Sequence, residues 1–118
     1  MSVLENVIGL INSATGLEVK ALDTDNANDC IVYQYYTVSD NGAVAQVKLQ
    51  LRIIAHSLND VLSYEKQIKN VLLCAGDISK VEGVKSIELN GGGTLKDYET
   101  NTIQNILYFI ITKRSEVE

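Results

Sequence analysis

The sequence of 118 residues contains no proline, only two cysteines and a single histidine. Without proline, the turns must depend on Gly, Asn, Asp and Ser. Cys30 and Cys74 cannot build the disulfide framework of a small secreted domain. No charged and then apolar leader opens the chain, and no apolar run reaches the length of a membrane span. We therefore expect a cytosolic protein with reduced thiols and no membrane partner.

Positive charge is also scarce, since the sequence has 10 Lys and Arg but 15 Asp and Glu, which gives a net charge of −5. Nucleic-acid binding usually needs clustered basic residues, so we expect no nucleic-acid readout. The hydrophobic fraction of 46% is ordinary for a globular protein. No internal repeat or linker divides the chain, which predicts a single domain over residues 1–118.

The strongest pattern is the alternation from Val44 to His56. Such alternation is typical of a β-strand with one buried and one wet face. The apolar side of this strand carries Val47, Leu49, Leu51, Ile53 and Ala55. The polar side carries Gln46, Lys48, Gln50 and Arg52.

A second strand is predicted from Cys30 to Val38, joined to the first by a hairpin turn within Ser39–Gly42. The turn has two forms, and a slip of one residue exchanges the faces of the strand. A two-residue turn places Val32 and Tyr36 on the apolar face. A three-residue Asp40–Gly42 loop, with Gly42 left-handed, places Ile31, Tyr33 and Tyr35 there. We prefer the three-residue form because it keeps Gln34 off the buried face.

Two amphipathic helices are indicated by apolar residues at helical spacing. Ser2 and Glu5 form a capping box for a helix from Ser2 to Thr15, which Gly16 stops. Ser57 caps a second helix that Gly76 ends. Its predicted apolar stripe comprises Leu58, Val61, Leu62, Tyr64, Ile68, Val71, Leu72 and Ala75.

The remaining strands are less regular. Leu17–Leu22 is a weak edge strand, Val84–Asn90 is a short strand, and Gly91–Asn101 is a long mobile hairpin loop. Thr102–Lys113 is apolar on both sides, which predicts a central strand or a strand covered by another subunit. The fold class expected is α+β, with a mainly antiparallel sheet of four to five strands and two helices packed on one face. The element order is α-β-β-β-α-β-β.

No stretch supplies a metal or catalytic centre. The Asp23–Asp29 loop has Asn28 and Gln34 where a calcium loop needs Gly and Glu. His56, Cys30 and Cys74 lack the close spacing of zinc ligands and of a Cys–His nucleophile. We therefore expect no metal, no cofactor and no enzymatic activity.

Two loop motifs are also interpreted as structural and not as parts of a binding or catalytic site. Gly91-Gly92-Gly93 is not followed by the Lys and helix of a phosphate-binding loop. Asp97 and Glu99, which flank Tyr98, are interpreted as a solvated loop rather than a catalytic carboxylate pair.

Two segments carry a resemblance to a known family. One is Val32–Tyr36 paired with the alternating strand and followed by the Ser57-Leu58-Asn59-Asp60 helix start. The other is Lys96–Asn101 leading into Ile106–Ile111. With this element order, the chain resembles the small tail-terminator and head–tail joining proteins of long-tailed bacteriophages and prophages.

That resemblance implies a virion structural protein that is assembled in the bacterial host cytoplasm. Its subunits would form a ring, typically a hexamer, that caps the tail tube and meets the head connector proteins. The interface residues expected in such a ring are Tyr33, Tyr35, Tyr36, Lys48, Gln50, Arg52, Lys96, Asp97 and Tyr98. The alternatives are a small ferredoxin-like α+β domain for ligand binding or regulation and, third, a small enzyme or its accessory subunit.

Overall fold

The computed structural model describes residues 3–21, 29–73, 84–99 and 101–114. One five-stranded sheet has the strand order β1-β2-β3-β5-β4, and the element order matches the expected α-β-β-β-α-β-β. The helices are α1 (Val3–Thr15) and α2 (Leu58–Leu72). The strands are β1 (Val19–Ala21), β2 (Cys30–Asp40), β3 (Val44–Ala55), β4 (Val84–Asp97) and β5 (Thr102–Arg114). The predicted α+β class is confirmed.

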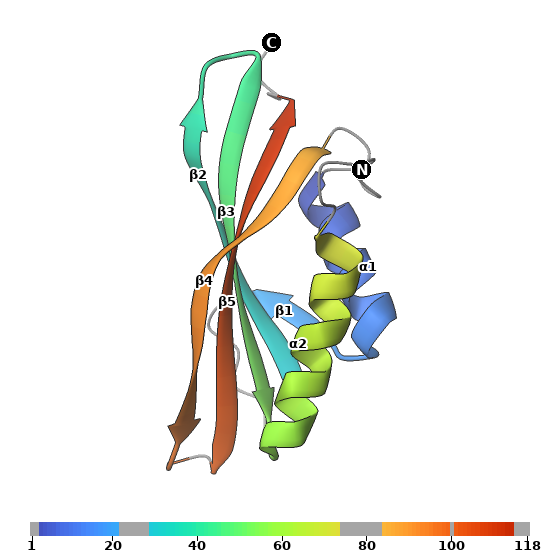
Figure 1. Ribbon diagram of the computed structural model, residues 1–118, viewed down its shortest axis with the longest axis vertical. Coiled ribbons are helices and arrows are strands. Elements are labelled where there is room, and N and C mark those ends of the chain that lie inside the picture. The colour runs from blue at the N-terminus through green and yellow to red at the C-terminus, as the bar shows by residue number, and fades with distance from the viewer. Residues whose placement is uncertain (1–2, 22–28, 74–83, 100, 115–118) are drawn as a thin grey trace.

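Both helices lie on the same side of a twisted sheet (Figure 1). The β2–β3 and β4–β5 pairs are long antiparallel hairpins, and β3 pairs antiparallel with β5 at the centre of the sheet. Only β1 is parallel to its neighbour, β2. Among the described residues, no helix covers the opposite side of the sheet, which we call the open face.

The hydrophobic core lies between the sheet and the two helices. The apolar side chains of β3 are buried at alternate positions, as the sequence pattern predicts. Leu107, Phe109 and Ile111 of β5 pair with Leu51, Leu49 and Val47 of β3. The helices contribute Val3, Val7, Ile11, Val61, Ile68 and Leu72 to this core.

The β2–β3 hairpin confirms the preferred face of β2 but not the exact loop. Tyr33 pairs with Leu51 and Tyr35 with Leu49, so both tyrosines lie on the helix side. Asp40 is already paired with Ala45, and the loop is therefore displaced by one residue to positions 41–43. The side-chain oxygen of Asn41 accepts hydrogen bonds from the backbone N–H groups of Ala43 and Val44, at 2.9 and 2.8 Å. A register shift between Thr37 and Ser39 accommodates this loop.

The second helix begins as predicted but ends earlier. Ser57 Oγ accepts the Asp60 backbone N–H at 3.1 Å, which confirms the N-cap. The helix ends at Leu72, because Leu73 is already extended, with φ −73° and ψ 123°. Ala75 and Gly76, and Ser2 of the predicted capping box, lie outside the described residues.

Two members of the predicted apolar stripe on α2 are not buried. Leu58 and Leu62 are 48% and 46% exposed. An α-helix rotates by about 100° per residue, so Leu58 and Leu62 point to one flank of the helix, about 60–120° away from the buried Val61 and Ile68. The opposite flank carries Tyr64 and Val71, which pack against the core. The stripe is therefore narrower than the sequence suggests.

The predicted long loop from Gly91 to Asn101 is wrong. β4 continues through the three glycines to Asp97, and the hairpin turn lies between Asp97 and Thr102. A register shift between Leu89 and Gly92 marks a bulge in β4. A Cβ atom at Gly92 would lie 2.3 Å from the carbonyl oxygen of Ile106, so glycine permits the close approach of the two backbones.

Candidate functional site

The open face is made of cross-strand rows that mix cations, amides and large apolar groups. Residues that are directly paired share a face of the sheet. One row aligns Tyr36, Lys48, Ile110 and Glu88. The next aligns Gln34, Gln50 and Tyr108, and a third aligns Val32, Arg52 and Ile106. Tyrosine and arginine are enriched at protein interfaces, so this composition suits a contact surface.

Two cations on the open face have specific surroundings. Lys48 Nζ lies 4.7 Å from the centroid of the Tyr108 ring, within the range of a cation–π interaction. Arg52 Nε is buried and has no hydrogen-bond partner among the described residues. A buried donor without an acceptor lowers the stability of a folded protein, because the donor has lost its hydrogen bonds to water.

The structure separates the nine predicted interface residues into three places. Tyr36, Lys48, Gln50 and Arg52 lie together on the open face. Tyr33 and Tyr35 point to the helix side and pack against the core.

Lys96, Asp97 and Tyr98 lie at the end of the β4–β5 hairpin, where Lys96 Nζ is 5.3 Å from the Tyr98 ring centroid. Asp97 Oδ1 accepts the Glu99 backbone N–H at 3.0 Å, so this carboxylate shapes the turn. Tyr108 belongs to the open face but was missing from the predicted set. Alternation along β5 puts Tyr108 on the side opposite to Phe109, and only the β3–β5 register shows that it joins Gln50 and Lys48.

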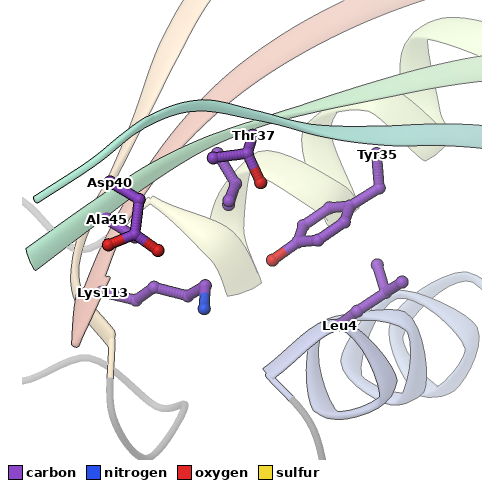
Figure 2. Close-up of a pocket in the computed structure, with 7 residues that line it drawn as sticks. Leu4, Tyr35, Thr37, Asp40, Ala45 and Lys113 are labelled. Atoms are coloured by element: carbon purple, nitrogen blue, oxygen red, sulfur yellow. The ribbon is translucent and has the colours of Figure 1, made fainter. Parts of the chain in front are cut away.

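A cavity of about 300 Å³ lies on the helix side, beside the first turn of α1. Figure 2 shows the Tyr35 hydroxyl and the Lys113 ammonium group directed toward its interior. Asp40 and Thr37 line the same space, together with Leu4, Ala45 and Val47. Lys113 is only 6% exposed, which is rare for a lysine. The sequence pattern did not indicate this cavity, because it depends on the β2–β3–β5 register.

The other candidate groups have structural surroundings. His56 Nδ1 lies 2.9 Å from Asp29 Oδ1 at an exposed position. Cys30 is buried, and this burial raises the pKa of its thiol above the ordinary value of 9.0. The described residues contain no group of three or more His, Cys, Asp or Glu side chains that could hold a metal ion. Cys74 and residues 23–28 of the rejected calcium loop lie outside the described residues.

The glycines at 91–93 lie inside a strand and not at a helix start, so they do not form a phosphate-binding loop. Within the described part of the chain, neither helix is long and apolar enough to cross a membrane.

Comparisons with known proteins give a fold but no family. No family model and no curated protein matches the sequence. Among solved structures, the chain is similar to a chain from the virion of a native gene transfer agent particle, with a TM-score of 0.66 and 12% sequence identity. The similarity covers 97% of this chain and 92% of that chain. Over nearly its whole length, this protein therefore has a fold similar to that of a chain in a virion.

Proposed function

We propose that this protein is a structural subunit of a phage-type virion. The observation that carries the proposal is the fold similarity to a virion chain, which extends over nearly the whole length of both chains. The sequence resemblance to tail-terminator and head–tail joining proteins points in the same direction. Within the virion, we assign the chain to a ring of identical subunits, typically a hexamer, that caps the tail tube and meets the head connector.

The open face is the proposed contact surface of this ring. It presents Tyr36, which is 43% exposed, beside Lys48, and Arg52 lies two rows further along the same face. A neighbouring subunit would cover this apolar area and offer an acceptor to Arg52 Nε. Both changes favour association, through the hydrophobic effect and through the repair of an unpaired donor.

The proposed role requires no catalysis, metal or cofactor. Metal analysis of protein purified without chelator tests this part of the proposal. Stoichiometric zinc that disappears when Cys30 and Cys74 are both changed to Ser would contradict it.

Assembly is tested by light scattering across a concentration series and by negative-stain microscopy of the purified protein. We expect ring-shaped particles whose mass is a multiple of the subunit mass. Arg52→Glu should abolish them, because it places a carboxylate where the neighbour offers an acceptor. Lys66→Glu is the matched control, since Lys66 is exposed on α2 and the charge change is identical. A strictly monomeric protein at high concentration, or equal loss in both variants, would contradict the proposed contact.

A small ligand-binding domain is the second candidate, and the cavity around Lys113 favours it. The buried ammonium group, the Tyr35 hydroxyl and the apolar wall of Ala45 and Val47 suit a small molecule with one polar end. A thermal-shift screen with small metabolites tests this function. A reproducible shift that Lys113→Met abolishes would favour it over a purely structural role.

A further inference from the structure

A second cavity, of about 310 Å³, lies between α2 and the outer strand β4. We call it the β4 groove. Three elements line this groove. They are α2 with Glu65, β4 with Leu89, Gly91–Gly93 and Thr94, and β5 with Asn105 and Leu107. β4 forms one edge of the sheet, and α2 packs over β3 and β5. The glycines contribute no side chains, so the groove stays open where a strand would usually fill it.

Asn105 is the unusual residue in the β4 groove. Its side chain is 2% exposed, and its amide nitrogen Nδ2 has no hydrogen-bond partner among the described residues. Most buried polar side-chain atoms in folded proteins are paired, so an exception calls for an explanation. Asn105 lines the groove, so an occupant of the groove is the nearest source of an acceptor for this donor.

The polar groups of the groove define the chemistry of its occupant. Asn105 Nδ2 needs an acceptor. Glu65 is held by Lys69 at 2.9 Å, and its carboxylate oxygens can accept a further hydrogen bond. A carboxylate would be repelled by Glu65, whereas a neutral hydroxyl both accepts from Asn105 and donates to Glu65. Leu89 and Leu107 provide apolar walls, and the bare glycine backbone provides a flat surface for a ring. These features together fit a phenol.

The same chain presents such a group at the end of the β4–β5 hairpin. Tyr98 is 82% exposed, more than any other exposed large hydrophobic residue among those described. It cannot enter the groove of its own subunit. It lies four positions beyond Thr94, the β4 residue that pairs with Asn105, and four positions span about 13 Å along a strand.

We infer that the β4 groove receives the Tyr98 side chain of a second copy of this chain, with the phenol hydroxyl between Asn105 and Glu65. The contact joins two different surfaces, so it repeats from subunit to subunit and produces a ring or a filament. The inference rests on the proposed function as a self-assembling subunit, and it adds a second contact to the one on the open face.

A double-mutant cycle on the association constant, measured by sedimentation with the full chain, tests the pairing. Tyr98→Ala should weaken association at least tenfold. Tyr98→Phe, which removes only the hydroxyl, should weaken it several-fold in the wild type and clearly less in Asn105→Leu, where only the hydrogen bond to Glu65 remains to be lost. Thr94→Met, at an exposed position, should block the groove and mimic Tyr98→Ala. Leu62→Ala is the control, since it truncates an exposed side chain on α2 that does not line the groove.

Each outcome has a separate meaning. Additive effects of Tyr98→Phe and Asn105→Leu, or normal association of Tyr98→Ala, would overturn the Tyr98 contact while leaving the proposed function intact. A wild-type protein that does not associate at any concentration would overturn the proposed function itself. Thermal unfolding of each variant monitors the fold. Asn105→Leu should unfold at the same or a higher temperature than wild type, because it removes an unpaired buried donor.

Discussion

Leu51 and Gln50 are neighbours on β3 with opposite surroundings. Leu51 is fully buried between the sheet and the helices, whereas Gln50 points to the open face. Leu51→Ala should lower the free energy of unfolding by about 2–5 kcal/mol, the usual range for a buried leucine. Gln50→Ala should change it by about 0.5 kcal/mol or less. Chemical denaturation of both variants is the measurement, and equal midpoints would show that the two faces of β3 are misassigned.

Cys30 should make stability depend on alkaline pH. Burial raises the pKa of its thiol above 9.0, while Lys20 opposes this shift. The unfolded chain therefore loses the thiol proton at a lower pH than the folded chain. As the pH rises through 9, the unfolded state binds fewer protons, so the free energy of unfolding falls.

Urea titrations between pH 7 and 9.5, at fixed protein concentration, measure this slope. Cys30→Ala should flatten it, whatever the variant's stability at pH 7. The pKa of Tyr64 is also raised, by burial and by the nearby Asp29 and Asp60, which adds a similar loss above its ordinary value of 10.0. An identical slope in wild type and Cys30→Ala up to pH 9.5 would rule out the contribution of the thiol.

Among the elements, β4 offers a prediction with an internal control. Gly92 and Gly93 are adjacent in the bulged part of the strand. A Cβ atom at Gly92 would meet the Ile106 carbonyl oxygen at 2.3 Å, whereas one at Gly93 would meet nothing within 4 Å. Gly92→Ala should therefore destabilise the protein by about 1–3 kcal/mol, the usual cost of overpacking.

Gly93→Ala should be neutral or slightly stabilising, because alanine restricts the unfolded chain more than glycine does. Thermal unfolding of the two variants provides the comparison. Equal melting temperatures would show that β4 does not approach β5 as closely as described.

Periodicity predicted the regular elements well and the bulged ones poorly. The alternation of β3 and the Ser57 cap of α2 are local signals, and both are confirmed. The continuation of β4 through Gly91–Gly93 was missed because glycine is usually a loop signal. Here it serves a close contact with β5, and that contact involves residues distant in sequence.

The candidate sites depend even more on distant pairing. The open-face group of Tyr36, Lys48 and Arg52 followed from the β2–β3 hairpin, which is local. The addition of Tyr108 and the cavity at Lys113 required the β3–β5 register, and the groove at Asn105 required α2 to lie beside the β4–β5 hairpin. This register joins segments that α2 separates in the sequence. No pattern within one strand specifies it, so the sequence could give only part of these surfaces.

At the scale of the molecule, the sheet has a centre and two unequal edges. β3 and β5 each pair with strands on both sides, and twelve residue pairs join them. β1 has only three pairs, all with β2, and forms one edge. Elements with few partners open locally, whereas central strands open only when the whole domain unfolds.

This inequality has a consequence for amide hydrogen exchange. The backbone N–H groups shared by β3 and β5 should exchange with deuterium at a rate set by global unfolding. Those of β1 should exchange far faster, through detachment of the short strand alone. Exchange followed by NMR with increasing denaturant should show the rates of β3 and β5 rising steeply and those of β1 hardly changing. The two long hairpins would then behave as a single cooperative unit along the β3–β5 junction, with β1 as a separately opening edge.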